Sequence, residues 1–403
     1  MRLLAVTVWA FVCVTLLGVL AYSMLLWSQY WRWATPRNTG VRAAAPRRRS
    51  HLSRGYSNAS MGGGVLQPHR MAPLPKDKLF AKVEAYRVQL ERQLRRAQWD
   101  SVRPVGAGGR PASDRYGLRP SRRKPARFAP ADQLLARARA LRMGMLTRDT
   151  EPFKRMGYSQ YFPPTDFYAN QFNSCALVSS AGSMLGSKLG PEIDGHETVL
   201  RFNDAPTAGF EADVGARTTV RLLNSQVLAR PEFDFFNSAL YRNVTLVAWD
   251  PSRDRQPLDK WVEHPEFDLF PAYWLRREVL PDEPFYLLHP DSVWEAWHFL
   301  DNENPGPVLR NPPSSGFLGL LLLLKQCRHV DAYELVPSMR LTKRCHYYEV
   351  HEDLGCTLGD WHPLAAEKLL ALHLASSSVH ALEQAFARGT LPLSTRDGEP
   401  RGG

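Results

Sequence analysis

The 403-residue sequence lacks the signatures of several common enzyme classes. It contains no Asp-x-Asp, Cys-x-x-Cys, His-Glu-x-x-His or Gly-x-Ser-x-Gly motif and no Walker loop. These absences argue against a dedicated zinc site, a serine-hydrolase elbow and a P-loop. A nucleotide-sugar enzyme without Asp-x-Asp must stabilise its leaving phosphate without a bound divalent metal. We therefore expect no metal and no cofactor.

Charged side chains are absent between Leu3 and Trp31, and Leu3–Trp27 is almost wholly apolar. A run of this length can cross a bilayer as one helix and exceeds the apolar core of a cleavable signal peptide. The pattern predicts a cytoplasmic tail at residues 1–2 and a transmembrane signal-anchor at residues 3–27.

The orientation of this anchor is ambiguous from local features. Arginines gather downstream of it, which by charge alone favours a cytoplasmic location for the rest of the chain. The sequons at Asn58 and Asn243, and four cysteines that could form two disulfides, favour a lumenal location instead.

Acidic residues are scarce in the first third of the chain. Residues 32–148 carry 27 Lys and Arg against 6 Asp and Glu, whereas residues 149–403 carry 23 against 34. An Arg-, Pro- and Gly-rich segment with few aromatics is typical of a solvated stem rather than of a nucleic-acid domain. We predict a largely flexible basic stem at 28–150, with helices near Leu79–Trp99 and Leu134–Met145, and a globular domain at 151–403.

Short apolar runs alternate with helical segments after about residue 155, which predicts an α/β fold. The expected strands are Ala176–Val178, Val199–Phe202, Thr218–Leu223, Val244–Trp249, Phe285–Leu288 and Val330–Leu335. Ser180, Asn203, Asn224 and Asp250 follow the first four. Because open α/β sheets bind ligands at the carboxyl ends of their strands, these residues could line one crevice, although such residues are also common in turns.

One segment has the features of an anion-binding helix start. Pro312 and Pro313 interrupt regular structure, and Ser314-Ser315-Gly316 then precedes a strongly apolar run. Serine is a favoured N-cap, and the open N–H groups of a helix start attract anions. The alternative is an ordinary capped core helix.

A second cluster surrounds two closely spaced cysteines. Ten residues separate Cys345 from Cys356, which allows a small disulfide loop. Such a loop would present His346, Thr357 and His362 together. Histidine is the usual general base at neutral pH, although a single histidine is more often structural.

Four segments together resemble the sialyl motifs of animal sialyltransferases. Ser174–Leu223 resembles the long motif and Asn311–Leu335 the short motif. His346-Tyr347-Tyr348-Glu349 resembles the third motif, and His362 with Glu367 forms the His-x4-Glu of the very short motif. The order and spacing of the four motifs match the family, and their residues are most similar to those of the β-galactoside alpha-2,6-sialyltransferases.

The resemblance implies a Rossmann-like, GT-A-variant fold with a mostly parallel sheet, following a transmembrane helix and a flexible stem. It implies a single-pass type II protein of the Golgi membrane with a lumenal catalytic domain. The implied reaction moves sialic acid from CMP-sialic acid to O6 of terminal β-galactose (Galβ1,4GlcNAc) on glycoproteins, with inversion and without metal. A homodimer and a released soluble form are left open.

The resemblance also implies residue roles, with His362 as the general base. The implied donor-binding residues are Ser180, Asn203, Asn224, Ser314, Ser315, Gly316, His346 and Thr357. The implied acceptor-binding residues are Gln226, Glu266, Trp361 and Lys368, with Glu367 as motif support. The implied disulfides are Cys175–Cys327 and Cys345–Cys356, which leave Cys13 in the membrane.

Three departures from the family pattern bear on these roles. The family's third disulfide has no cysteines here, Glu266 stands where the galactose-specific pattern has Asp, and Trp361 stands where it has Tyr. The alternatives are a sialyltransferase for another acceptor such as GalNAc, a lumenal sugar- or nucleotide-binding module without catalysis, and a protein acting through its basic stem.

Overall fold

The computed structural model describes residues 76–102, 115–353, 355–359, 361–375 and 379–394. The predicted anchor Leu3–Trp27, Cys13 and the sequon at Asn58 lie outside these residues. Among the helices that are described, none has the length and apolar character that a bilayer crossing requires.

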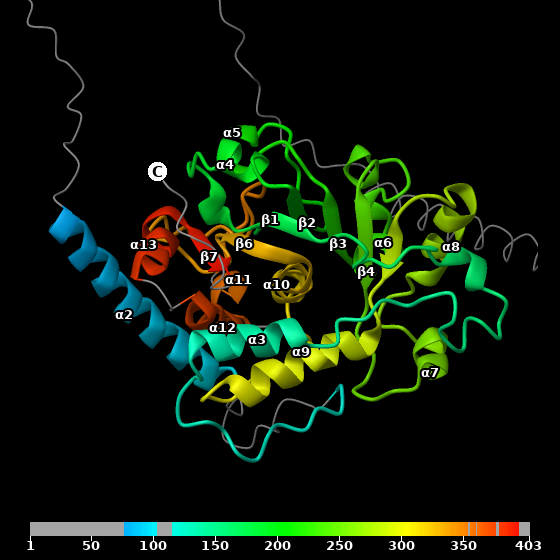
Figure 1. Ribbon diagram of the computed structural model, residues 1–403, viewed down its shortest axis with the longest axis horizontal. Coiled ribbons are helices and arrows are strands. Elements are labelled where there is room, and N and C mark those ends of the chain that lie inside the picture. Colours follow the sequence, from blue (N-terminus) through cyan, green and yellow to red (C-terminus); the bar gives the residue numbers. More distant parts are fainter. Residues whose placement is uncertain (1–75, 103–114, 354, 360, 376–378, 395–403) are drawn as a thin grey trace, which may run out of the picture. The chain divides into compact units, whose positions relative to one another are not determined.

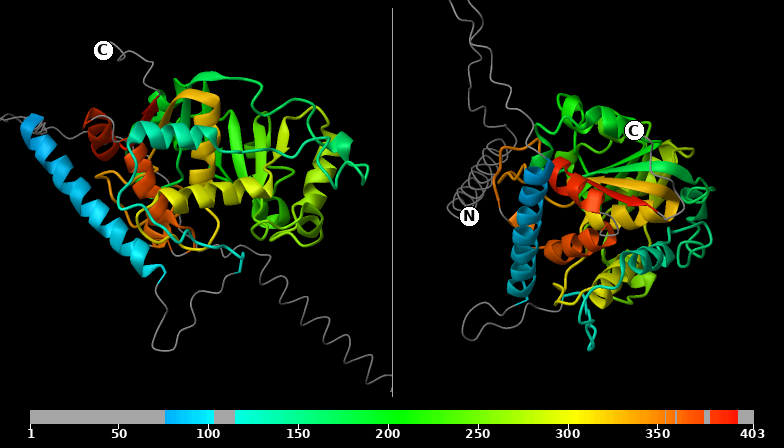
Figure 2. Two further views of the ribbon diagram at one scale, coloured as in Figure 1. Left: turned by 60° about the horizontal axis from the view of Figure 1, so that its bottom comes forward. Right: turned by 60° about the vertical axis from the view of Figure 1, so that its left-hand side comes forward.

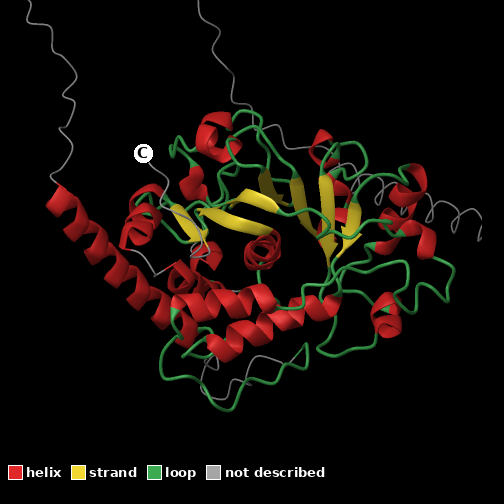
Figure 3. Cartoon of the chain, in the orientation of Figure 1, coloured by secondary structure: helices red, strands yellow, loops and turns green. Residues whose placement is uncertain are grey.

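A single mixed sheet forms the centre of the described chain (Figure 3). Its strands are β1 Phe172–Val178, β2 Thr198–Phe202, β3 Val220–Asn224, β4 Thr245–Trp249, β5 Phe285–Leu287, β6 Cys327–Tyr333 and β7 Thr390–Ser394. Their order is β5-β4-β3-β2-β1-β6-β7, and every neighbouring pair is parallel except β6 with β7. The predicted α/β class with a mostly parallel sheet is therefore confirmed.

All six predicted strands are present, with ends shifted by a few residues, but β7 was not predicted. This strand contains Pro392, which lies opposite Asp331 of β6 in the register. Proline weakens a strand pattern and is tolerated mainly at sheet edges, which is where β7 lies.

The strands are largely buried because both faces of the sheet are covered, and most of their buried residues are apolar. In β1, Cys175 and Leu177 face the larger core, whereas Ala176 and Val178 face a smaller one. The larger core receives α2 Lys76–Asp100, α3 Ala131–Ala140, α9 Pro290–Glu303, α10 Ser315–Gln326, α12 Leu364–Ala375 and α13 Val379–Arg388. The opposite face carries α4 Gly190–Asp194, α5 Glu211–Val214, α6 Ser225–Ala229, α7 Leu258–Glu263 and α8 Phe270–Val279.

Helix α10 lies between the sheet and helices α3 and α9, and Figure 1 shows it almost end-on. It is apolar on all sides, and Phe317 to Leu324 are buried. A Cβ added at Gly319 would stand 2.9 Å from a ring carbon of Phe202 and 3.1 Å from a methyl group of Leu200. The glycine at position 319 therefore permits α10 to approach the sheet closely. This packing against the sheet fixes the position at which the helix begins.

Helix α2 belongs to the compact fold and not to a separate stem. Val83, Leu90 and Leu94 are buried in the larger core, and the Tyr86 ring packs edge-on against Phe386, 5.7 Å between centroids. Figure 2 shows α2 lying alongside α12 and α13.

The expected domain boundary at residue 151 is therefore too late. The helix predicted at Leu79–Trp99 is present as α2. The helix predicted at Leu134–Met145 is only partly correct, because α3 begins at Ala131 and ends at Ala140, and Met145 lies in a β-bridge with Leu288. Buried Tyr116 and Leu118 also join the core between them. The high density of arginine led the prediction to assign this region to a stem. The apolar face of the helix is visible in the sequence, but the sequence does not show that the distant helices α12 and α13 cover it.

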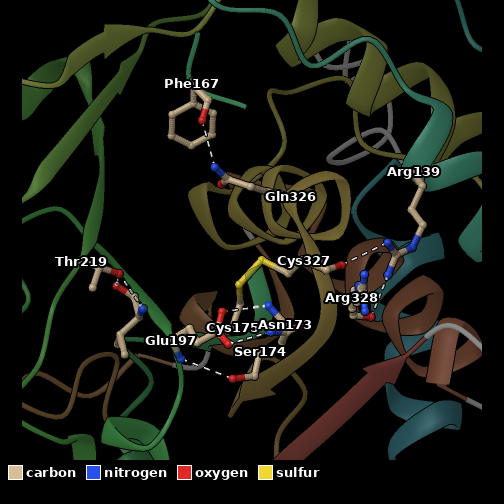
Figure 4. Close-up of a disulfide and its surroundings, with 11 residues drawn as sticks. Arg139, Phe167, Asn173, Ser174, Cys175, Glu197, Thr219, Gln326, Cys327 and Arg328 are labelled. Atoms are coloured by element: carbon tan, nitrogen blue, oxygen red, sulfur yellow. Dashed lines mark hydrogen bonds between the residues drawn. A yellow bond between two sulfur atoms is a disulfide. The ribbon is translucent and has the colours of Figure 1, made fainter. Parts of the chain in front are cut away.

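Two disulfides stabilise the domain, and both predicted pairings are confirmed. Cys175 of β1 is bonded to Cys327 at the start of β6, with Cα atoms 6.2 Å apart. Figure 4 shows Arg139 of α3 next to this disulfide. Arg139 donates hydrogen bonds to the carbonyls of Cys327 (3.1 Å) and Arg328 (3.2 Å). Cys345–Cys356 closes a short loop, with Cα atoms 5.3 Å apart.

The packing of α2 can be tested with Leu94→Ala. Leu94 is fully buried, so the substitution should lower the free energy of unfolding by about 2–5 kcal/mol. Trp99→Ala on the same helix is the control, because its side chain is 56% exposed and should matter far less. Denaturant unfolding of the two variants measures both. Equal effects would contradict the packing described for α2.

Candidate active site

A cavity of about 470 Å³ opens at the carboxyl edge of the sheet. It lies where strand order reverses between β1 and β6, the place where open α/β sheets bind ligands. Ser180 follows β1, Asn203 follows β2, Asn224 ends β3, and Glu334 follows β6; all four line the cavity. The predicted crevice is therefore present, but Asp250 does not line it.

The ends of β2 and β3 are bonded to each other through Asn203. This residue has a left-handed backbone (φ 44°), and its Oδ1 accepts a hydrogen bond from the Asn224 amide at 3.0 Å. Arg221 donates to the Asn203 carbonyl at 2.7 Å. The Asn224 Oδ1 is buried without a hydrogen-bond partner. Since buried polar atoms are nearly always paired, this oxygen is a ready acceptor for a ligand N–H or O–H.

Helix α10 begins at the cavity in the way that the sequence predicted. Ser314 is the N-cap, and its Oγ accepts a hydrogen bond from the Phe317 amide at 3.1 Å. The Ser315 Oγ accepts from the Trp249 indole N–H at 3.0 Å, so its own hydroxyl proton is left to donate. The positive end of the helix dipole thus faces the cavity beside a hydroxyl donor.

Glu367 of α12 holds the start of α10 in place. The Ser314 amide donates to its Oε1 at 2.7 Å, and the Ser314 hydroxyl donates to its Oε2 at 2.5 Å. Burial raises the pKa of Glu367, while the nearby His362 and the Ser314 bonds act in the opposite direction. The Ser314 hydroxyl is therefore fully used in fixing the helix start, and Ser315 is the better placed to contact a ligand.

The geometry of His362 fixes its tautomer. Its Nδ1 lies 2.8 Å from the carbonyl oxygen of Pro312. A carbonyl only accepts hydrogen bonds, so Nδ1 carries the proton and Nε2 of the neutral ring carries the lone pair. His362 is half-buried and lines the cavity. A ring oriented in this way can accept a proton from a ligand hydroxyl.

Two cationic side chains contribute to the lining, Arg344 and Lys368. Burial lowers the pKa of Lys368 to about 8, with the adjacent Glu367 acting in the opposite direction. Arg344 was not predicted as a site residue, and its position next to Cys345 is the one local signal that points to it. Both residues suit a cavity that receives an anion.

The disulfide loop completes one wall of the cavity. Both His346 and Thr357 line it, as predicted. The Nδ1 of His346 pairs with Glu349 at 2.8 Å, and its ring stacks on Tyr348 with centroids 5.2 Å apart. Thr357 lies in the short helix α11, Gly355–Leu358.

The predicted acceptor residues are only partly brought together. Trp361 and Lys368 line the cavity, and the Trp361 side chain is 48% exposed. Gln226 and Glu266 do not line it. Glu266 is instead ion-paired with Arg115, which comes from the segment before α3.

Only one group of residues in the described part of the chain has metal-ligand spacing. It consists of Cys345, Asp353 and Cys356. Both sulfur atoms are bonded to each other in the disulfide, so neither can serve as a thiolate ligand. This group is therefore not a candidate metal centre.

Sequence comparison gives this arrangement a family. The sequence model of glycosyltransferase family 29 (sialyltransferase) matches residues 129–379, well over half of the chain. The chain belongs to this family. The match includes every residue that lines the cavity.

Individual family 29 members are similar at moderate identity. The chain is 48% identical over 222 residues to beta-galactoside alpha-2,6-sialyltransferase 2 of Xenopus tropicalis, covering 54% of this chain and 43% of that protein. It is 42% identical over 266 residues to the Homo sapiens protein of the same name, covering 65% and 50%. The chain spans about half the length of the curated relatives it matches.

A crystal structure of a mammalian sialyltransferase is similar at 20% identity, with a TM-score of 0.38, covering 62% of this chain and 87% of that chain. At this level of similarity the family assignment depends on the sequence match and not on the structural one.

Removing the Glu367 carboxylate should loosen the family 29 site. Glu367→Ala leaves the Ser314 amide and hydroxyl without their acceptors, so the free energy of unfolding should fall by about 1–3 kcal/mol. Glu303→Ala is the matched control, because its partner Arg137 is half exposed and such pairs contribute about 1 kcal/mol or less. Chemical denaturation of both variants provides the measurement. A larger loss in the control would refute the role given to Glu367.

Proposed function

We propose that this protein transfers sialic acid from CMP-sialic acid to O6 of a terminal β-galactose, as in Galβ1,4GlcNAc on glycoprotein glycans. The observation that carries the proposal is the pairing of His362 with the α10 helix start. An oriented base and an anion-binding corner line the same cavity. Membership of family 29 and the names of the similar alpha-2,6-sialyltransferases support it.

The donor would be bound by groups that suit its charge. Its phosphate and carboxylate would meet the N-terminus of α10, the Ser315 hydroxyl and the cations Arg344 and Lys368. The unpaired Asn224 oxygen would accept a hydrogen bond from the nucleoside. Ser180, His346 and Thr357 would complete the donor wall. Because helix dipole, hydroxyl and cations already balance the leaving phosphate, we propose that transfer needs no metal.

The transfer would be a single displacement. His362 Nε2 removes the proton from the galactose 6-hydroxyl as that oxygen attacks C2 of sialic acid. The bond from C2 to the phosphate oxygen breaks, and CMP leaves with the electron pair. Attack from the face opposite the leaving group inverts the anomeric centre. The resulting imidazolium keeps its Nδ1–H on the Pro312 carbonyl and is stabilised by the charge of Glu367.

The acceptor assignment depends on fewer contacts. The half-exposed Trp361 ring can stack on a sugar face, and Lys368 lies in the same wall. Glu266 and Gln226 would be reached by the part of the glycan outside the cavity. The ion pair of Glu266 with Arg115 favours testing a second acceptor class, GalNAc-terminated glycans, because this carboxylate is already engaged.

We also propose the cellular setting. Two disulfides are typical of an oxidising compartment, and Asn243 is an exposed sequon residue. These features support a type II protein of the Golgi membrane, anchored through Leu3–Trp27, with its Rossmann-like GT-A-variant domain in the lumen.

The base is tested by His362→Ala. With CMP-sialic acid and Galβ1,4GlcNAc, the native protein should form a product that 2,6-selective sialidases cleave, and EDTA should not affect it. The variant should lose about 10²–10⁴-fold in kcat, because the proton acceptor is gone. His351→Ala is the control, since its side chain is exposed and outside the cavity lining.

Other outcomes of this assay separate the alternatives. CMP release that depends on a GalNAc-terminated acceptor would retain the donor assignment and replace the acceptor. Binding of CMP without turnover of any acceptor would show a lectin-like or nucleotide-binding module. Full inhibition by EDTA would contradict the metal-free proposal.

The two serines of the helix start should behave differently. Ser315→Ala removes a hydroxyl donor to the anion, so the Kd for CMP should rise by about tenfold or more, as expected for a hydrogen bond to a charged group. Ser314→Ala should mainly lower the free energy of unfolding, by about 0.5–2 kcal/mol, as for loss of an N-cap. Calorimetric titration with CMP and thermal unfolding distinguish them. A larger change in Kd for Ser314→Ala would reverse the assignment.

A further inference from the structure

Asp250, directly after β4, is a buried carboxylate on which three segments converge. Its Oδ1 accepts hydrogen bonds from the Ser225 hydroxyl and from the Phe267 amide at 3.2 Å. Its Oδ2 accepts from the Trp261 indole N–H and from the Glu266 amide, each at 2.9 Å. The side chain is fully buried. The Asp250 carboxylate thus holds together the start of α6, helix α7 and the loop that follows α7.

The donors around Asp250 are all neutral. Within the described residues it forms no ion pair, and burial raises its pKa to about 6. Asp250, Glu266 and Arg115 all act electrostatically on the Tyr116 hydroxyl, and Arg115 forms an ion pair with Glu266. A buried charge without a cation is costly to stability. Such a group is more readily understood as a device that fixes geometry than as a source of stability.

The segments that Asp250 joins are those of the two outlying acceptor residues. Ser225 stands between Asn224, which lines the cavity, and Gln226. The loop amide bonded to Oδ2 belongs to Glu266 itself. Trp249, the residue before Asp250, donates to Ser315 at the α10 start. The end of β4 therefore connects the donor corner to both Gln226 and Glu266.

A second contact closes this region from outside. Arg115 pairs with Glu266, and the neighbouring Tyr116 ring is buried against Trp294, 5.2 Å between centroids. The Tyr116 carbonyl accepts from the Asp254 amide at 2.8 Å. The loop that carries Glu266 is thus bonded on its inner side by Asp250 and on its outer side by Arg115.

We propose that Asp250 is a positioning residue for the acceptor. Its carboxylate holds the start of α6 and the loop 264–267 at the separation that an acceptor sugar spanning Gln226 and Glu266 requires, an inference that rests on the proposed function. The start of α10, which lines the donor cavity, is connected to β4 by the hydrogen bond from Trp249 to Ser315. The cavity therefore keeps its shape when the Asp250 carboxylate is removed.

The test compares Asp250→Asn with the native protein in CMP-sialic acid transfer to Galβ1,4GlcNAc. An amide retains the size of the side chain but accepts at only one oxygen, so the loop loses its fixed place. The acceptor KM should rise by about tenfold, as for loss of a charge-assisted hydrogen bond, while the KM for CMP-sialic acid stays close to the native value. Ser225→Ala, which removes one donor and keeps the carboxylate, should shift the acceptor KM in the same direction by less.

Asp301→Asn serves as the matched control. Asp301 is equally buried and accepts from the Ser121 amide at 2.6 Å and from Lys124, but it contacts neither α6 nor the loop 264–267. Its loss should lower thermal stability and leave the acceptor KM unchanged. A rise in acceptor KM in this control would mean that general destabilisation explains the effect.

The pH profile adds a readout that a purely structural role would not change. In the native protein the acceptor KM should rise as the pH falls through about 6, because a protonated Asp250 gives up one of its four bonds. In Asp250→Asn the acceptor KM should be high and flat across that range. Separate determination of KM and kcat at each pH distinguishes this effect on the acceptor from any effect on the chemical step.

Three results would overturn the inference. They are an unchanged acceptor KM in both Asp250→Asn and Ser225→Ala, an equal rise in donor and acceptor KM, and a native acceptor KM without pH dependence near 6. A native protein that transfers sialic acid to no acceptor would overturn the proposed function first and this inference with it. Native transfer with unaffected variants would overturn this inference alone.

Discussion

The bond between Glu367 and Ser314 is the interaction on which the site depends. Two neighbouring residues hold the segment 312–314 by hydrogen bonds. The ring of His362 bonds to the Pro312 carbonyl, and the carboxylate of Glu367 accepts from the amide and hydroxyl of Ser314. The base and the anion-binding corner are therefore positioned against each other and not separately. Because both holding residues lie within five positions of the sequence, a displacement of α12 moves the two halves of the site together.

The carboxyl edge of the sheet uses buried acidic groups as fixing points. Glu334 after β6 accepts from the hydroxyls of Ser183 and Ser338 and pairs with Arg340, and burial raises its pKa. Asp250 after β4 and Glu367 in α12 do the same for their neighbours. Each carboxylate accepts from several donors at once, so one side chain determines the course of two or more loops. Burying these charges lowers the stability of the fold, but the hydrogen bonds that they accept give the loops a defined geometry.

The strands and the helix start could be predicted because their signals are local. Short, mostly apolar runs mark strands that are buried on both faces, and two prolines followed by serine mark the start of α10. Strand β7 could not be found in this way, since its pattern contains Pro392 and its place depends on β6. The roles of Asp250 and Arg344 could not be predicted from the sequence either. The contacts of Asp250 with Ser225 and Glu266, and the position of Arg344 in the cavity lining, depend on how separate segments pack together in the fold.

Helix α2 has consequences for the order in which the chain is made. Its packing partner α12 begins at Leu364, about 260 residues after α2 ends at Asp100. At a synthesis rate of roughly 5–20 residues per second, α2 waits tens of seconds for that partner. The apolar stripe around Leu90 and Leu94 is without cover throughout this interval. Among the described helices, α2 is thus the first to be synthesised, yet it can complete its packing only after α12 has been made.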